Sequence, residues 1–245
     1  MDDITGVTIQ PLKEPSDFVR PFRMNYIQTG NEKSWDLVLQ KPSVAVIIYN
    51  VSKSKLILVK QFRPAVYVSA LKRNSQNEDL DRIRSDINAE KGITLELCAG
   101  IIDKCDKTPA EIAQLEVLEE CGYDTPLENI DHVLTFLSGV GIGGENMHLF
   151  YTEVTDEMRI SKGGGLEIEG EMIDVVEMTC DEVESYLTLK ECKSPMFTIF
   201  GLTWFLNNKN KQADSVTNTN MSNSIMCISL VGVLAFVTGM IWSSN

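Results

Sequence analysis

Blocks of apolar residues separated by short polar stretches mark the first half of the chain, and they predict strands. Two apolar runs, SVAVIIYN at 43–50 and KLILVKQF at 55–62, flank the polar stretch VSKS. This arrangement is typical of a β-hairpin. The sequence TLELCAG at 94–100 predicts one further strand that runs into a loop. The polar and charged segment 72–91 predicts a surface insertion that is either partly helical or mobile.

The next pattern predicts a helix with a clear start and a clear end. Thr108 suits the N-cap position, Pro109 suits the first helical position, and Glu111 completes a T-x-x-E capping box. Gly122 suits the residue that ends a helix, because glycine adopts the left-handed conformation at little cost. We therefore expect a helix over 109–121.

The remaining blocks predict an α/β domain that ends near residue 208. Apolar runs at 132–139, 147–154 and 172–178 predict strands, and the stretches 181–189 and 196–206 predict closing helices. A glycine-rich loop, KGGGLEIEGE, lies before the third of these runs. Strands followed by a helix and then by further strands and helices indicate one mixed α/β domain over 1–208.

The composition changes sharply after this domain. Residues 209–223 are polar without periodicity and predict a linker. Residues 224–242 contain no charged side chain, and about 20 apolar residues are enough to span a membrane. We expect a C-terminal transmembrane tail anchor that leaves the catalytic domain in the cytoplasm, and the alternatives are a core helix or an atypical chain end. The acidic start, MDDITG, does not resemble a signal peptide.

The charge balance limits the partners of the chain. The formal net charge is -13, and no run of lysine and arginine stands out. Binding to nucleic acid is therefore disfavoured, because it relies on cationic side chains that neutralise phosphates. An acidic protein that acts on anionic phosphates would need a metal cation as an intermediary.

Three glutamates crowd the last turns of the predicted helix. At roughly 100° per residue, Glu116, Glu119 and Glu120 project from one side, and no lysine or arginine lies within the helix. Their mutual repulsion and the negative end of the helix dipole both oppose this arrangement. A hard divalent cation would reverse both effects. For three glutamates alone, a solvated acidic surface is the simpler interpretation.

The wider sequence favours the metal. Residues 100–123, GIIDKCDKTPAEIAQLEVLEECGY, resemble the Nudix box of the Nudix hydrolases. The matching positions are Glu116, Val117, Glu119, Glu120, Gly122 and Tyr123. Leu115 stands where the family usually has arginine, and Lys107 stands where it usually has glutamate. These two departures predict a weaker charge network behind the metal ligands.

The resemblance extends over about residues 25–206, and it is to the uridine diphosphate glucose pyrophosphatase branch of the family. It implies a Nudix fold, an α/β/α sandwich with a mixed sheet, and a homodimer. It also implies Mg2+-dependent hydrolysis, with Mn2+ as a substitute, of the pyrophosphate bond of nucleoside diphosphate sugars, with UDP-glucose giving UMP and glucose 1-phosphate. One alternative is ADP-ribose hydrolysis. Another, which rests on Leu115 and Lys107, is a weakly active or non-catalytic module that binds nucleotide sugars.

The candidate metal ligands are in and beside the acidic helix. We expect Glu116 and Glu120 to bind the metal directly, and Glu119 to be a ligand or a neighbouring acceptor. By resemblance, the backbone carbonyl of Ala99 also binds metal. Gly100 would let the chain approach the metal and the phosphates closely.

Arg63 is the candidate for gripping the diphosphate, because its planar donors suit phosphate oxygens. The alternative for Arg63 is a surface salt bridge, and Lys60 is a weaker candidate on the outer face of the same strand. By resemblance, the general base is a glutamate on a loop after the box. The candidates are Glu169 and Glu171, with Glu167 in the same loop and Glu145 in an earlier one.

Two further residues are better explained by packing than by catalysis. His148 lies in an apolar run and is expected to be a packed core histidine. Trp35 would serve as a structural or dimer contact as readily as a platform for stacking a base.

Overall fold

The computed structural model describes residues 4, 6–14, 16, 19–74, 88–166, 168 and 170–210 of the 245. The chain divides into two compact units, Met1–Leu202 and Thr203–Asn245, and residues 203–210 are the described part of the second. The predicted anchor at 224–242 and all but the first two residues of the predicted linker lie outside the described residues. Within the described ranges, no helix is both long enough and apolar enough to cross a membrane.

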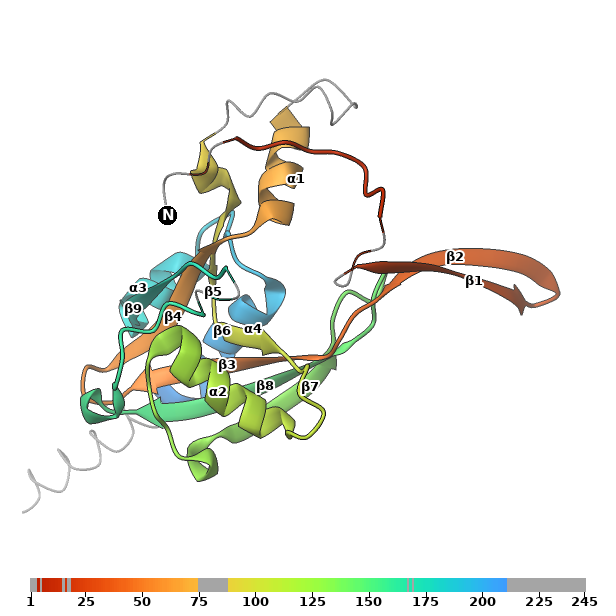
Figure 1. Cartoon of the computed structure of the whole chain (residues 1–245). Coiled ribbons are helices and arrows are strands. Elements are labelled where there is room, and N and C mark those ends of the chain that lie inside the picture. Colours follow the sequence, from red (N-terminus) through yellow and green to blue (C-terminus); the bar gives the residue numbers. More distant parts are fainter. Residues whose placement is uncertain are drawn as a thin grey trace, which may run out of the picture. The chain divides into compact units, whose positions relative to one another are not determined.

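A seven-stranded mixed sheet forms the centre of the first unit (Figure 1). Its strands are β3 (Ser43–Asn50), β4 (Lys55–Phe62), β5 (Ile93–Glu96), β6 (Cys98–Ile101), β7 (Asp131–Leu137), β8 (Asn146–Val154) and β9 (Ile173–Thr179). β3 runs parallel to β8, and the other pairs in this sheet are antiparallel. The α/β class with a mixed sheet is confirmed, and the predicted β3–β4 hairpin has the expected bounds.

The prediction of one strand over TLELCAG is wrong, because two short strands occupy that stretch. β5 pairs with β4, whereas β6 pairs with β3. Leu97 lies between them, is fully buried, and donates its backbone N–H to the hydroxyl of Thr198 at 3.1 Å. A side chain 101 positions away thus takes the place of a strand partner at the break. The break leaves β5 and β6 with different partners in the sheet.

The predicted insertion is helical at both of its described ends. Helix α1 (Pro64–Asn74) begins before it, and a short 3-10 helix (Ala89–Gly92) ends it. Tyr67, Ala70 and Leu71 are buried at i, i+3 and i+4, so one face of α1 packs inward. The sequence analysis did not predict α1, and the central part of the insertion, 75–87, lies outside the described residues.

Helix α2 (Pro109–Cys121) is confirmed with its predicted ends. The side chains of Thr108 and Glu111 form both halves of the capping box, and Gly122 ends the helix with a φ of 81°. The inner face of α2 joins the core of the β3, β4 and β8 strands through Ile112, Ala113, Val117 and Cys121. Glu120 is buried beside this face, whereas Glu116 and Glu119 are half-buried.

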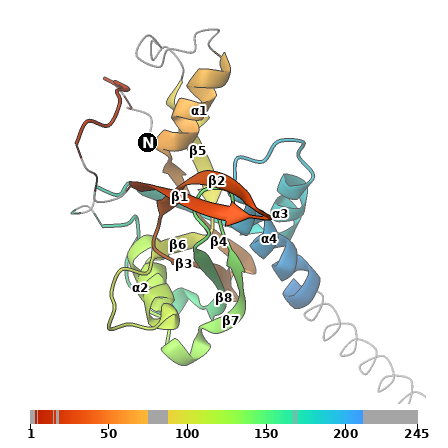
Figure 2. The same ribbon diagram turned by 90° about the vertical axis from the view of Figure 1, so that its right-hand side faces the viewer.

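Helices cover both faces of the sheet. Figure 2 shows the sheet between α2 on one side and α3 (Cys180–Leu187) and α4 (Met196–Phe205) on the other. At Gly201 a Cβ atom would lie 2.7 Å from Leu97 Cδ1 and 3.2 Å from Ile47 Cγ1. This glycine is therefore needed for α4 to pack closely on the sheet.

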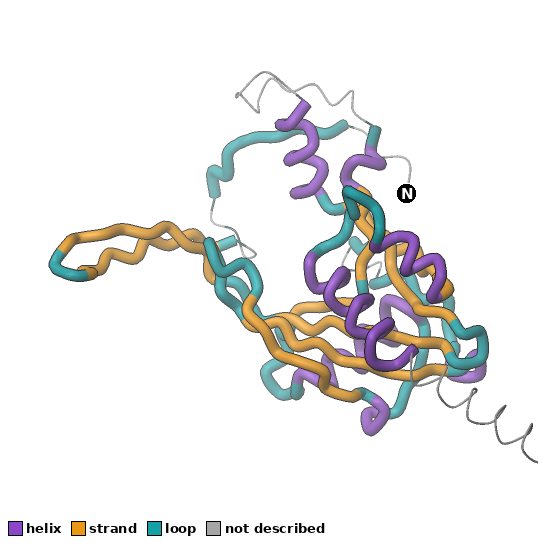
Figure 3. Tube along the Cα trace, turned by 180° about the vertical axis from the view of Figure 1, so that it is seen from behind, coloured by secondary structure: helices purple, strands orange, loops and turns teal. Residues whose placement is uncertain are grey.

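A second sheet, which the sequence analysis did not predict, is the hairpin of β1 (Arg20–Gln28) and β2 (Asn31–Leu39). Its two strands pair with each other and with no other described strand, and they extend away from the main sheet (Figure 3). Val38 N–H donates to Ile142 O at 2.8 Å, and Trp35 Nε1 donates to Gly141 O at 3.1 Å. The base of the hairpin is thus held by the β7–β8 loop.

Candidate active site

The centre of the candidate site is the carboxylate of Glu120, in the last turn of α2. Glu120 is only 2% exposed, and Ala99 N–H on β6 donates to its Oε2 at 3.0 Å. Burial is the main cause that raises the pKa of Glu120 to about 8, with smaller contributions from the charges of Glu116 and Glu171, while the Ala99 N–H and the Cys98 thiol oppose the shift. A cation at this point would restore the ionised form.

Glu116 lies one turn earlier on α2 and reaches back toward β6. A Cβ atom on Gly100 would overlap the carboxylate of Glu116, so only glycine leaves room for this side chain. Gly100 was predicted to let the chain approach the metal and the phosphates closely, and in the structure it leaves room for the Glu116 side chain. The group that approaches Gly100 here is a predicted metal ligand, which glycine allows to lie against the strand.

The glycine-rich loop caps the C-terminal end of α2, next to Glu119 and Glu120. Gly164 N–H donates to Glu120 O at 2.9 Å, and Gly165 N–H donates to Glu119 O at 3.2 Å. A Cβ atom on Gly163 would overlap the Glu120 carbonyl oxygen, so this contact also requires glycine. The two N–H groups satisfy carbonyls that would otherwise lack partners at the helix end. The loop is thereby fixed beside the acidic residues.

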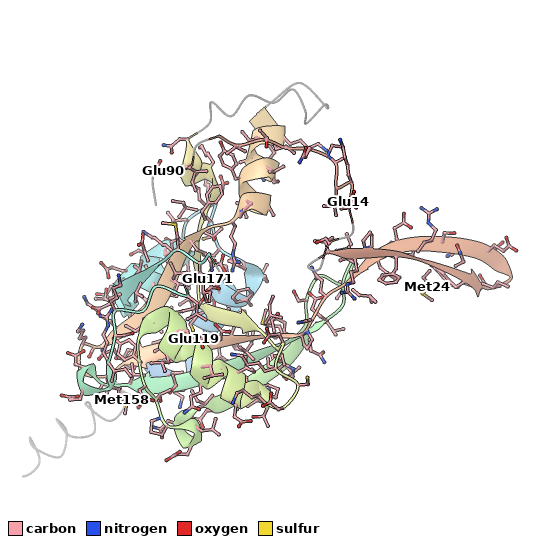
Figure 4. All side chains as sticks on the ribbon, viewed as in Figure 1. Glu14, Met24, Glu90, Glu119, Met158 and Glu171 are labelled. Atoms are coloured by element: carbon pink, nitrogen blue, oxygen red, sulfur yellow. The ribbon has the colours of Figure 1, made fainter. Side chains whose placement is uncertain are left out.

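Glu171, a candidate base, lies on the same loop, whereas Glu169 and Glu167 lie outside the described residues. Leu166 N–H donates to Glu171 Oε2 at 3.0 Å, so one carboxylate oxygen helps to hold the loop. A Cβ atom on Gly165, whose N–H donates to Glu119 O, would lie 2.7 Å from Glu171 Oε2, so Glu171 lies beside the end of α2. Figure 4 marks Glu171 above Glu119.

Arg63 follows β4 directly and forms a two-point ion pair with Glu96 of β5. Its Nε donates to Glu96 Oε1 at 2.9 Å and its Nη2 donates to Oε2 at 2.7 Å, while the Thr94 hydroxyl donates to Oε1 at 2.6 Å. Glu96 is 1% exposed, whereas the Arg63 side chain is 45% exposed. Arg63 Nη1 makes no hydrogen bond to any residue in the described ranges, so it can still donate to a ligand.

The environment of Arg63 links this ion pair to the acidic residues. Hydrogen bonding to Glu96 raises the pKa of Arg63, and the charges of Glu120 and Glu171 raise it further. Sequence reasoning missed Glu96, although a single acidic residue inside an apolar strand was a usable signal. Charged residues are rarely buried without a partner.

A pocket of about 800 Å3 opens beside Arg63, between α1, β5 and the segment before α4. We call it the basic pocket, after the four cationic residues that line it: Arg63, Arg73, Lys91 and Lys193. Its acidic residues are Glu96 and Glu191, and Val66, Ala70 and Phe197 supply apolar wall. Except for Arg63, these residues escaped the sequence analysis, because they become neighbours only through the fold.

The other sequence candidates have structural partners or exposed positions. Lys60 is exposed on β4. Glu145 lies within 3.0 and 3.1 Å of the Gln40 amide nitrogen when that amide is oriented to donate. His148 Nδ1 is 3.0 Å from the Thr135 hydroxyl on the neighbouring strand, and Trp35 is bound to the β7–β8 loop. The contact of Trp35 supports a structural role, His148 is half-buried rather than a core residue, and Glu145 stays a candidate base.

The predicted metal ligands suit a hard cation by chemistry. Glu116 and Glu120 supply carboxylate oxygens, and β6 brings the backbone of Ala99 within hydrogen-bonding distance of Glu120. Among the described residues, no three His, Cys, Asp or Glu side chains are already gathered into a metal cluster. The donor set fits Mg2+ in kind, and the repulsion between Glu116 and Glu120 is what a cation would relieve.

Comparison with known proteins finds relatives over most of the chain. Uridine diphosphate glucose pyrophosphatase NUDT14 from Mus musculus is 36% identical over 212 residues, which are 84% of this chain and 95% of the relative. The Bos taurus protein of that name is 35% identical over the same shares. A GDP-mannose pyrophosphatase from Cronobacter sakazakii is 34% identical over 56% of this chain and 60% of its own length. No family model matches the chain.

Proposed function

The chain belongs to the Nudix hydrolases, in the uridine diphosphate glucose pyrophosphatase branch, and we propose that it hydrolyses the pyrophosphate bond of UDP-sugars. UDP-glucose would give UMP and glucose 1-phosphate. The observation that carries the proposal is the buried carboxylate of Glu120 beside the charge of Glu116. A cation would stabilise these like charges, and a metal-dependent hydrolase of anionic diphosphates uses one. The mixed sheet, the helices on both of its faces and the Nudix box at residues 100–123 together support the Nudix α/β/α sandwich.

Mg2+, with Mn2+ as a substitute, is the cofactor we propose. Glu116 and Glu120 would hold it, with Glu119 as a further ligand or acceptor and the Ala99 carbonyl as a backbone ligand. When bound, such an ion neutralises phosphate charge and makes water more acidic. The oxygen donors support this choice, because Mg2+ prefers carboxylates.

Arg63 is proposed to orient the diphosphate. Glu96 holds two of its nitrogens, so the guanidinium has a fixed plane and presents Nη1 to a phosphate oxygen. Holding the group in advance reduces the freedom that is lost when the substrate binds. Both readings of Arg63 from the sequence therefore combine: the salt bridge positions the residue that would grip the phosphate.

A glutamate of the glycine-rich loop is proposed to take the proton from the attacking water. Glu171 lies against Gly165 on the loop that caps α2, which supports it. Glu169 remains a prediction of equal rank, since it lies outside the described residues. Comparing the pH–rate profiles of Glu169→Gln and Glu171→Gln would decide between them, because loss of the base removes the acidic limb of the profile.

A substrate comparison tests the reaction itself. Purified protein is incubated with UDP-glucose, ADP-ribose or GDP-mannose in Mg2+ or Mn2+, and the nucleoside monophosphate and sugar phosphate are quantified by chromatography. We expect UMP and glucose 1-phosphate in equal amounts, and the highest kcat/KM for the UDP-sugar. A higher value for ADP-ribose would favour the alternative activity. Tight binding of UDP-glucose without release of UMP under either metal would favour the non-catalytic module.

A homodimer is proposed from the β1–β2 hairpin. Phe22, Met24, Ile27, Trp35 and Leu39 are all largely exposed on this hairpin, and its strands have no other described strand as a partner. Exposed apolar side chains in this number are typical of an interface. Sedimentation velocity on wild type and on a Phe22→Ser/Met24→Ser variant tests the proposal: a monomeric wild type would contradict it.

The C-terminal anchor is proposed on the sequence of residues 224–242 alone. Fractionation of cells that make the full chain or a chain truncated before Ser222 would test it. We expect only the full chain in the membrane fraction. Recovery of both chains in the soluble fraction would contradict the anchor.

A further inference from the structure

The basic pocket concentrates positive charge in a strongly acidic chain. Four cationic side chains and two acidic ones line it, an excess of two positive charges, although the whole chain has a net charge of -13. Within the pocket, Arg63 is matched by Glu96. Three cations therefore remain against Glu191 alone, and they are the unusual feature.

These three cations keep their charge available to a ligand. Arg73 and Lys91 are exposed, and neither side chain makes a hydrogen bond or ion pair with another described residue. Lys193 Nζ donates to the carbonyl oxygen of Glu90 at 3.1 Å, which orients the ammonium group without neutralising it. The cations are thus held around a common cavity rather than paired with carboxylates.

The pocket is within reach of the acidic site. Arg63 lines the pocket, and so does its ion-pair partner Glu96 on β5. Glu96 of the pocket precedes Ala99 by three residues, and three residues of strand span at most about 10 Å. A diphosphate held beside Ala99 and Arg63 would therefore bring one end of a nucleotide sugar to the pocket.

The size and walls of the pocket suit such an end. A volume of about 800 Å3 lies in the range of small-ligand sites, roughly 300–1,000 Å3. Val66, Ala70 and Phe197 give it apolar walls against which a sugar or base ring can pack. The cationic side chains of the pocket have a different role from these apolar walls. They suit a charged substituent on the ring rather than the ring itself.

We propose that the basic pocket is a subsite for an anionic group, a carboxylate or a phosphate, that the substrate carries in addition to its diphosphate. The inference rests on the proposed function and narrows its substrate class. Arg73, Lys91 and Lys193 determine this specificity by attracting the extra charge. Nucleotide sugars with such a group are bound more tightly than counterparts that carry the diphosphate alone.

Two matched substrate pairs test the subsite. UDP-glucuronate differs from UDP-glucose by a carboxylate on the sugar, and ADP-ribose 2′-phosphate differs from ADP-ribose by a phosphate on the nucleoside. We expect at least one anionic substrate to have a kcat/KM about fivefold above that of its partner, mainly through KM, because exposed ion pairs contribute up to about 1 kcal/mol. The pair that shows the gain identifies which half of the substrate enters the pocket. Added salt should reduce the gain.

Two neighbouring residues of α1 give the variant and its control. Arg73→Gln and Lys72→Gln each remove one positive charge from an exposed position, but only Arg73 lines the pocket. We expect Arg73→Gln to reduce the preference for the anionic substrate several-fold and Lys72→Gln to leave it unchanged. The inference is overturned if neither anionic substrate is preferred, or if the two variants change the ratio equally.

The proposed function can fail separately from the subsite. If wild type cleaves none of the four substrates with Mg2+ or Mn2+, the proposed reaction is wrong. Calorimetric binding of UDP-glucuronate, UDP-glucose, ADP-ribose 2′-phosphate and ADP-ribose to wild type and Arg73→Gln then tests the pocket directly. Tighter binding of an anionic member by wild type, lost in Arg73→Gln, supports the subsite, and equal affinities within both pairs overturn it.

Discussion

The acidic end of α2 and the basic pocket both lie near Arg63, and they differ in how well water solvates their charged side chains. Glu120 is buried, so its charge is unfavourable until another charge compensates it. Arg73 and Lys91 are exposed, so water already stabilises them. Changes on the acidic side should therefore decide whether the reaction occurs. Changes on the basic side should decide which substrate is preferred.

The largest effect is expected from Glu120→Gln, which removes the buried charge while keeping the shape of the side chain. The variant should lose activity on UDP-glucose by at least about 100-fold, because a neutral amide is a poor ligand for Mg2+. Steady-state kinetics at saturating Mg2+ measures the loss. Glu184→Gln, an exposed glutamate on α3, is the matched control and should retain wild-type kcat. Near-normal turnover in Glu120→Gln would remove this residue from the metal site.

Gly100→Ala tests whether the position of Glu116 matters as well as its charge. The new methyl group would overlap the Glu116 carboxylate and displace it, so we expect kcat to fall roughly tenfold to 100-fold. The obstacle is the end of a flexible side chain, and stability should change by only about 1 kcal/mol. Gly141→Ala is the control, because nothing lies within 4 Å of its Cβ position. Equal activity in both variants would contradict the proposed role of Glu116.

The acidic side was predictable from the sequence because its signals are local. The apolar runs of β3 and β4 and the capping box of α2 each lie within a few residues, and so do the box glutamates. A helix with such ends fixes which side chains share one face. The likeness to a known family then gave those side chains a role.

The basic side was not predictable, because its contacts join distant parts of the chain. Arg63 and Glu96 are 33 residues apart and meet only because β5 pairs with β4 across the insertion. The division of TLELCAG into β5 and β6 likewise involves a hydrogen bond to Thr198, and no local sequence pattern indicates this contact. The β1–β2 hairpin was missed for another reason: in β1, Phe22, Met24 and Tyr26 alternate with polar residues, which is a usable strand signal, whereas β2 begins with the polar run NEKS.

Arg63→Lys tests the boundary between the two regions. Lysine keeps the charge but lacks the planar fork, so it cannot hold Glu96 at two points and also present a fixed donor to phosphate. We expect kcat/KM for UDP-glucose to fall about tenfold. Arg23→Lys alters a comparable two-point pair, with Asp36, on the exposed hairpin and should have no effect on kcat/KM. An equal loss in both variants would contradict a role for Arg63 in substrate binding.

The smallest effect concerns the metal-free protein and follows from the raised pKa of Glu120. The folded state holds a proton on Glu120 up to about pH 8, whereas the unfolded state releases it near pH 4.5. Between these values the folded state binds more protons, so its free energy of unfolding must fall as the pH rises. The upper limit is about 1.4 kcal/mol per pH unit, and relaxation around the carboxylate should leave a total of about 1–2 kcal/mol.

Thermal unfolding in the presence of a chelator measures this effect. Between pH 5 and 8, the Tm of wild type should fall by a few degrees more than the Tm of Glu120→Gln. Parallel Tm curves for the two proteins would mean that Glu120 is charged without a cation, and the contrast between a buried acidic side and a solvated basic side would then be lost.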